Sequence, residues 1–250
     1  MNVARHVPLG WLTLALLLAV PPGALEAQAP PDFLLRSPRV SLGIRAGYNL
    51  ALASSEVFDF TREQLTLSRG DFAAPSWGGQ LAVRIAPRVD LALDVSAATA
   101  RRGSEFREWV DTNDLPIEQE TVFRRIPVTL GVKAYLMERG RSVGRFAWIP
   151  TTFAPYVGIA AGAVWYRFEQ EGDFVDFESL DIFYDRFTDE GKAPTVHVYG
   201  GTDWSLSPGL FVTAEARYQW AKADMGADFL DFDPMDLSGL QGTIGLSVRF

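Results

Sequence analysis

The sequence predicts an all-β protein, an eight-stranded antiparallel up-and-down barrel that crosses a membrane. Apolar and polar residues alternate with a period of two through eight segments of the 250-residue chain. Each segment is long enough for a tilted strand to cross a bilayer, which takes about 9 to 11 residues. The connections between the segments are alternately short and long, as in a transmembrane barrel with short periplasmic turns and long extracellular loops.

The predicted strands cover residues 39–50, 77–85, 89–97, 125–136, 155–168, 195–206, 210–220 and 240–250. In most of them one face is apolar and the other is polar, charged or very small. The fifth, 155–168, is apolar on both alternating sets of positions, so its register stays open.

The long connections are residues 51–74, 101–121, 169–193 and 223–236, and they hold most of the 31 acidic residues. The connection near 138–153 is of medium length and carries Arg139, Arg141 and Arg145. Barrel topology places the long, acidic connections outside the cell. We expect mainly solvated loops there, with divalent cations bridging the carboxylates as the sharper alternative. Within 173–187 aromatic and acidic residues interleave, which fits a short amphipathic segment or a partner-binding surface.

A soluble sandwich or lipocalin-type barrel would show the same alternation with its apolar face turned inward. Aromatic residues near the strand ends favour the membrane alternative, because interfacial girdles lie there. The predicted interfacial aromatics are Tyr48, Trp77, Trp165, Trp204, Tyr218 and Trp220, and Tyr135 and Tyr166 also lie toward strand ends.

Residues 1–27 have the features of a secretory signal peptide, with Arg5, an apolar run over 10–20 and small residues at Ala24, Ala27 and Ala29. We expect cleavage after Ala27, with Ala29 as the alternative. Residues 28–38 then form a linker and 39–250 the barrel domain.

Composition excludes several function classes. The net charge of −8 and the pI near 4.9 argue against nucleic-acid binding. With no cysteine, and only His197 left after signal removal, the chain offers no thiolate chemistry and a poor set of metal ligands. No nucleophile elbow or metalloprotease motif occurs, so we expect no enzyme activity and no cofactor. His197 has no serine two residues away, as the His-x-Ser pattern of a lipid A deacylase-like enzyme at the barrel rim would require.

The last strand, 239–250, is amphipathic and ends on an aromatic residue. It resembles the C-terminal assembly signal of bacterial outer-membrane proteins, with Leu246, Val248 and Phe250 as its apolar positions. Residues 125–136 and 155–166 resemble central strands of the small outer-membrane β-barrel superfamily, which includes OmpA-, OmpX- and OmpW-like barrels. The resemblance implies a location in the bacterial outer membrane. It also implies outer-membrane lipid and lipopolysaccharide as surroundings and the barrel-assembly machinery as a partner. We expect a monomer.

Charged residues recur on the polar strand faces, which a membrane barrel turns toward its lumen. The predicted lumen charge network is Arg45, Arg84, Asp90, Asp94, Lys133, Asp203, Glu215, Arg217 and Arg249, with Glu215 at its centre. Buried ions are costly unless paired, and side chains just fill an eight-stranded interior. The sequence therefore predicts a structural or surface-interaction protein with a lumen plugged by charged side chains.

The alternative is an OmpW-like channel or transporter for small hydrophobic molecules. It would need an apolar pocket beneath the long connections, for which Phe106, Trp109, Phe123 and the fifth strand are the candidate linings.

Overall fold

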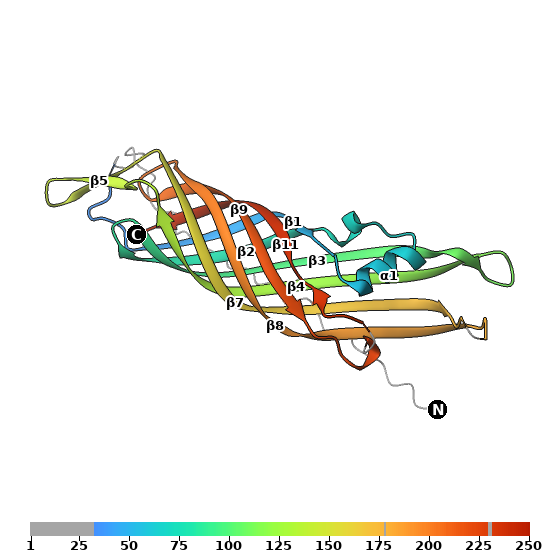
Figure 1. The fold of residues 1–250 in the computed structure, drawn as a ribbon. Helices are drawn as coiled ribbons and strands as arrows, with labels where there is room; N and C mark the ends of the chain where they lie inside the picture. Colours follow the sequence, from blue (N-terminus) through green and yellow to red (C-terminus); the bar gives the residue numbers. More distant parts are fainter. Residues whose placement is uncertain (1–32, 178, 230–231) are drawn as a thin grey trace, which may run out of the picture. The chain divides into compact units, whose positions relative to one another are not determined.

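The computed structural model describes residues 33–250 except 178, 230 and 231 (Figure 1). The predicted signal peptide lies outside the described residues. The long strands are β1 (Val40–Ala51), β2 (Ala74–Ala86), β3 (Val89–Val110), β4 (Pro116–Tyr135), β7 (Phe153–Val175), β8 (Ile182–Ser205), β9 (Leu210–Ala223) and β11 (Gly239–Arg249). The shorter elements are α1 (Glu56–Gln64), η1 (Arg69–Phe72), β5 (Gly140–Val143), β6 (Ala147–Pro150), η2 (Ala227–Phe229) and β10 (Met235–Asp236).

The eight long strands close into a barrel of antiparallel pairs. Each pairs with the next long strand along the chain, and β11 pairs back onto β1, where Leu42 lies opposite Val248. This closure leaves no free sheet edge around the barrel wall. The predicted fold class is therefore confirmed.

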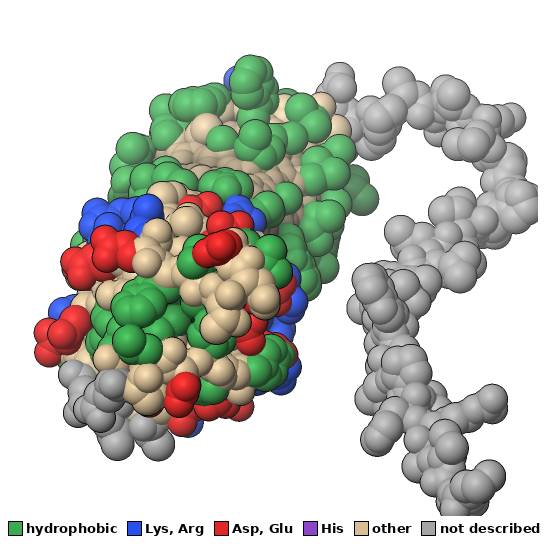
Figure 2. Space-filling model, turned by 90° about the vertical axis from the view of Figure 1, so that its right-hand side faces the viewer, with side chains coloured by type: hydrophobic (Ala, Val, Ile, Leu, Met, Phe, Trp, Pro, Cys, Tyr) green, Lys and Arg blue, Asp and Glu red, His purple; other side chains and the backbone are tan. Residues whose placement is uncertain are grey.

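Alternation along the strands sorts side chains between the two faces of the wall. Ile44 and Ile159 are 73% and 64% exposed, whereas Asp94 is 3% exposed. The outer wall is consequently apolar, and Figure 2 shows this wall behind the charged end of the barrel. An apolar outer belt around a closed barrel is the surface that fits lipid.

The structure settles the register of the fifth predicted strand, which is β7. Tyr156, Val164 and Phe168 face inward and are buried, while Val157 and Ile159 are exposed on the outer wall. The inner face is apolar here because β7 contributes tyrosines and very small residues.

Close packing explains the small residues of this wall. The Tyr199 ring lies so close to Gly158 that a Cβ there would come within 2.3 Å of the ring. A larger residue at Gly158 would therefore clash with Tyr199.

The four long connections are far more structured than we expected. Residues 101–121 and 169–193 are largely strand, because β3–β4 and β7–β8 continue as paired hairpins past the wall (Figure 1). The segment 173–187 is part of the second hairpin and not a separate amphipathic segment. Beyond the lipid nothing requires an apolar face, so the alternation lapses while backbone pairing continues.

Two of the aromatics placed near strand ends by the sequence do not lie on the outer wall. Tyr135 and Tyr166 are 5% and 6% exposed and face inward. In contrast, Trp77 and Trp204 are 70% and 58% exposed on the outside. Tyr135 and Tyr166 stand at inward-facing positions of the alternation. This direction keeps their side chains away from lipid, although both residues lie near strand ends.

The first long connection folds back toward the barrel as α1 and η1. Phe58 of α1 is fully buried, and its ring makes edge contacts with Phe72, Phe123 and Phe168 at centroid distances of 4.8, 5.2 and 5.6 Å. These residues belong to the larger of the two buried hydrophobic clusters. None of the helices in the described part of the chain is long and apolar enough to span a membrane.

Candidate functional site

Four charged residues from three strands meet in the middle of the lumen, and we call them the central cluster: Arg45, Asp94, Glu215 and Arg217. Arg45 Nη1 lies 3.0 Å from Glu215 Oε1, and Arg217 Nη2 lies 2.9 Å from the same oxygen. Arg217 Nη1 lies 3.2 Å from Asp94 Oδ1, and Arg45 also pairs with Asp94. Two cations and two anions balance, so each buried charge has two opposite partners.

Neighbouring polar groups complete the shell of the central cluster. Tyr156 donates a hydrogen bond of 2.8 Å to Glu215 Oε2. Arg217 Nη1 lies 3.4 Å from Nδ1 of His197, and since arginine can only donate, Nδ1 is the acceptor. The other ring nitrogen, Nε2, then carries the proton and lies 3.0 Å from Thr195 Oγ1. His197 is thus a buried lumen histidine in its neutral form.

Lys133 and Asp203 form a second buried ion pair, on β4 and β8. Lys133 Nζ is 3.1 Å from Asp203 Oδ2 and lies 3.6 Å from the centre of the Tyr156 ring. Asp203 also accepts hydrogen bonds from Tyr135 at 2.6 Å and from Thr213 at 2.8 Å. The carboxylate is therefore fully used within the lumen.

Asp90 pairs with a residue that the sequence analysis left out of the network. Arg139 follows β4 and donates to both carboxylate oxygens of Asp90, at 2.6 and 2.8 Å. Such a bidentate arginine–carboxylate pair is strong and directional. Arg139 was missed because it lies in a connection, where no alternation shows which way a side chain points.

Two predicted network members have no carboxylate partner among the described residues. Arg84 donates to the hydroxyl of Ser37, and Arg249 donates to that of Ser205 at 2.7 Å. The Arg249 guanidinium also lies 4.4 Å from the centre of the Phe211 ring. Both arginines lie near the end of the barrel that carries the short turns between β2 and β3 and between β8 and β9. We call it the short-turn end.

A further buried arginine, Arg125, lies where the charged lumen meets the larger hydrophobic cluster. Arg125 is 2% exposed and donates to Leu237 O at 3.1 Å and to Asn49 Oδ1 at 2.5 Å. Its guanidinium lies 4.7 Å from the centre of the Phe123 ring. Arg125 also was missed, although it stands on the polar face of the predicted strand 125–136.

The residues suggested as the lining of a transport pocket belong to packed structure. Phe106 and Phe123 are 9% and 2% exposed within the larger hydrophobic cluster, and Trp109 packs against it. The aromatic rings of α1 and η1 occupy the space beneath the long connections. The sequence could not show this, because it depends on the first connection folding back.

Other predicted sites are placed as follows. Tyr48, Trp165 and Trp220 are 45%, 47% and 47% exposed on the outer wall, and Tyr218 is partly exposed beside Trp220. Leu246 and Val248 are exposed on the outer face of β11, and Phe250, which follows the end of β11, is exposed as well. Among the described residues, no three histidine or acidic side chains are grouped so that they could hold a metal ion.

Comparisons with known proteins identify the fold. No protein-family model and no curated protein matches the sequence. The solved structures include the outer-membrane protein OprG from Pseudomonas aeruginosa, with 13% identity over 87% of this chain and 99% of that chain and a TM-score of 0.50. Neisserial surface protein A has 12% identity over 86% and 98% of the two chains, with a TM-score of 0.44. Ail of Yersinia pestis has 11% identity over 86% and 99%, with a TM-score of 0.43.

The fold and its inward charges define an eight-stranded antiparallel barrel of the outer-membrane type. The likeness to OprG shows this barrel fold, which is the fold that the resemblance stated from the sequence implies. The barrel, its apolar outer belt and its similarity to outer-membrane proteins agree with the predicted location in the bacterial outer membrane.

Proposed function

We propose that this protein is a structural outer-membrane barrel with a closed lumen, which presents two long hairpins as an interaction surface outside the cell. The main evidence for a closed lumen is that two different sets of side chains fill it at successive levels along the barrel. The central cluster and the Lys133–Asp203 pair occupy one part, and the aromatic cluster around Phe58 occupies the part beneath the long connections. One cavity beside Arg45 and Glu215 has a volume of only about 20 Å³.

Conductance across a planar bilayer tests the closed lumen. We expect no discrete current steps from purified protein whose folded state is verified in the same sample by heat-modifiable gel migration. Steps of reproducible size, abolished by boiling, would contradict a plugged barrel. As a positive control for detection, an open porin is inserted into the same membrane.

The hairpin ends support the surface role. At the β3–β4 end, Asp111 Oδ1 accepts hydrogen bonds from the backbone of Leu115 at 2.8 Å and of Asn113 at 2.7 Å. These bonds lower the pKa of Asp111, so the turn keeps its charge and its shape. The rings of Trp109 and Phe177 lie 6.1 Å apart and link the two hairpins.

Apolar side chains are nevertheless exposed at both hairpin ends. Val110 and Leu115 are 56% and 57% exposed on one, and Phe177 and Leu180 are 52% and 59% exposed on the other. Figure 2 shows apolar groups surrounded by charged side chains at this end. Exposed apolar groups within a polar rim are typical of interaction sites.

Adhesion of intact cells to polystyrene, an apolar probe, tests this surface. Cells displaying the protein are compared with cells displaying Val110→Asp/Leu180→Asp, with surface amounts matched by protease accessibility. We expect the variant to retain less than half of the adhesion. A matched control replaces Leu206, exposed at the opposite end, with Asp. Equal adhesion of all three strains would contradict the proposed surface role.

One observation favours the alternative function, passage of small hydrophobic molecules. A recess of about 560 Å³ on the wall of β4, β7 and β8 has an apolar side formed by Ile126, Trp165 and Tyr166 with Gly191. The rest of its lining is charged and consists of Arg124, Arg167, Glu190 and Lys192. Uptake of a hydrophobic fluorescent dye into vesicles tests it, because Gly191→Trp would fill the recess. Uptake that the variant abolishes would support transport, and equal uptake with protein-free vesicles would exclude it.

A further inference from the structure

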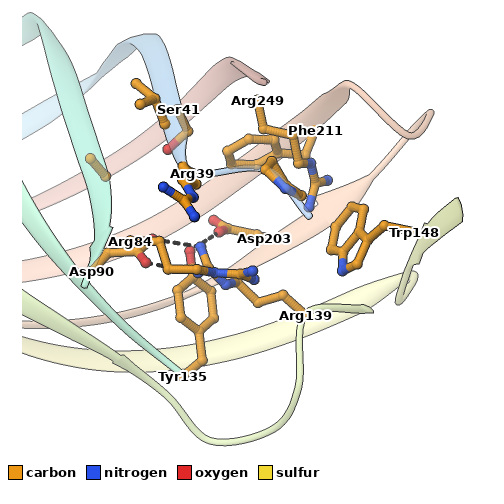
Figure 3. Close-up of a pocket in the computed structure, with 13 residues that line it drawn as sticks. Arg39, Ser41, Arg84, Asp90, Tyr135, Arg139, Trp148, Asp203, Phe211 and Arg249 are labelled. Atoms are coloured by element: carbon orange, nitrogen blue, oxygen red, sulfur yellow. Dashed lines mark hydrogen bonds and ion pairs between the residues drawn. The ribbon is translucent and has the colours of Figure 1, made fainter. Parts of the chain in front are cut away.

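A small chamber lies inside the short-turn end of the barrel, and four of the thirteen residues that line it are arginines (Figure 3). Its volume is about 20 Å³, and its charged lining residues are Arg39, Arg84, Asp90, Arg139, Asp203 and Arg249. An open groove of about 770 Å³ lies outside it and shares Arg39, Arg84, Arg139 and Trp148 with the chamber. A ligand can therefore lie in the groove and place one group in the chamber.

Cations outnumber available anions in the chamber. Asp90 is bound by Arg139, and Asp203 is bound by Lys133. Within the described part of the chain, Arg39, Arg84 and Arg249 have no carboxylate within ion-pair distance. Glu138, on the groove, lies 3.9 Å from Arg88 at an exposed position. Three arginines thus converge without an ion pair of their own, because the two nearby carboxylates, Asp90 and Asp203, are paired with other cations.

Buried arginine nitrogens without a hydrogen-bond partner also indicate that the chamber lacks an acceptor for them. The Nε atoms of Arg84, Arg139 and Arg249 are buried and have no hydrogen-bond partner. Arg249 is 8% exposed, and its guanidinium is held between Phe211 and Trp148, at 4.4 and 5.6 Å from the two ring centres. Leaving a charged donor buried and unpaired is costly.

The hairpin of β5 and β6 positions part of this lining. Trp148 of β6 is 3% exposed and exchanges backbone hydrogen bonds of 2.8 and 2.9 Å with Leu34. The segment before β1 and this hairpin therefore hold the indole beside Arg249. The chamber is built from backbone-paired elements, so its arginines are preorganised for a ligand.

We propose that this arginine chamber binds a phosphate oxyanion at the boundary between chamber and groove. Phosphate offers several acceptor oxygens to donors from different directions, and guanidinium groups match its geometry. Arg84 and Arg249 supply the inner contacts, and Arg39 contacts the anion from the groove. The phosphate comes either from solution or from a phospholipid headgroup of the adjacent leaflet, since this end of the barrel lies at the periplasmic side.

Isothermal titration of inorganic phosphate into protein in phosphate-free maltoside detergent tests the site, with sodium chloride at equal ionic strength as the reference. We expect saturable binding that weakens at least tenfold in Arg84→Gln and in Arg249→Gln. Arg167→Gln, an exposed arginine at the other end, is the matched control and leaves the affinity unchanged. Heat-modifiable migration verifies that each variant is folded. Should Arg84→Gln fail to fold, Arg84→Lys keeps the charge but loses the planar fork, and we expect weakened binding there too.

Competition with a short-chain phosphatidylglycerol distinguishes the two sources. If the lipid displaces inorganic phosphate at lower concentration than glycerol phosphate does, the site is a headgroup site. If both compete equally, it takes the free anion. Absence of saturable phosphate binding, or equal affinity in wild type and both inner-arginine variants, overturns the proposal. The conductance result does not bear on this site, so the two proposals can fail separately.

Discussion

Tyr156 and Glu215 are joined by a 2.8 Å hydrogen bond across the lumen, from a strand that is not adjacent to the one carrying the carboxylate. The other oxygen of Glu215 accepts from Arg45 at 3.0 Å and from Arg217 at 2.9 Å. One carboxylate therefore connects β1, β7 and β9. Such a group contributes to stability by linking strands that backbone pairing does not connect directly.

Replacing Glu215 with Gln is expected to destabilise the barrel strongly. The variant keeps the shape of the side chain but leaves two buried arginines to share Asp94. Removal of one partner from a buried ion pair costs about 3 to 5 kcal/mol. Urea unfolding followed by gel migration measures the loss. Glu190→Gln, at a 67% exposed carboxylate, is the control and should change stability by less than about 0.5 kcal/mol. Equal stability of the two variants would show that Glu215 is not central.

Loss of the Phe58 ring is expected to release the first long connection from the barrel mouth. The ring is fully buried among Phe72, Phe123 and Phe168, and truncation of such a ring costs about 3 to 5 kcal/mol. We predict that Phe58→Ala makes trypsin cleave faster after Arg62, while the barrel itself stays resistant. Phe60→Ala removes a neighbouring ring that is 42% exposed and serves as the control. Cleavage at the wild-type rate would mean that α1 is held by other contacts.

Side-chain direction could be predicted from the sequence because the period of two is a local property of a strand. Arg45 and Glu215 stand on polar faces of clear alternation, and the structure places them in contact. Side-chain direction could not be predicted at Arg139, because this residue lies in a connection. It could not be predicted in β7 either, because tyrosine and glycine replace polar residues on the inner face of that strand. Partners could not be predicted, since they depend on which strands face each other across the lumen.

Strand length was underestimated for a physical reason. Segments such as Arg101–Arg102 carry charge on both faces because both faces meet water, so the alternation that marks a lipid-crossing strand is absent. Their pairing is still regular, with Arg101 opposite Val122 in the β3–β4 register. The packing of α1 into the mouth of the barrel could not be predicted either. A short helix in a connection carries no sequence pattern that identifies the surface against which it packs.

Acid is expected to loosen the junction between the first and last long connections. Burial opposes the ionisation of Asp236, but hydrogen bonds from Ser54 and Ser238 outweigh it and hold the pKa of Asp236 below the usual carboxyl value. A lowered folded-state pKa contributes stability above the unfolded-state pKa of about 4, and this contribution is lost as pH falls through the folded value. We predict faster pepsin cleavage in the first connection below about pH 4. In Asp236→Asn the cleavage rate should be high at every pH tested, after correction for the pH dependence of pepsin on an unfolded substrate. A wild type that shows no change in this window would contradict the prediction.

Substitution of Phe250 tests native stability and assembly in the cell separately. Phe250 is 66% exposed on the outer face, while its carbonyl accepts backbone hydrogen bonds from Arg39 and Val40 at 2.9 and 3.0 Å. Phe250→Ala keeps those backbone bonds and removes an exposed ring, so stability after refolding in detergent should change by less than about 0.5 kcal/mol. If the C-terminal strand is the signal that the assembly machinery reads, the same variant should accumulate less folded protein in cells, by several-fold. Leu206→Ala, exposed at the same end, is the matched control and should assemble normally. Comparison of the heat-modifiable fraction in cells with refolding yields of the same proteins makes the distinction. A parallel loss in both settings would assign Phe250 to stability instead, because the machinery is absent from the refolding reaction.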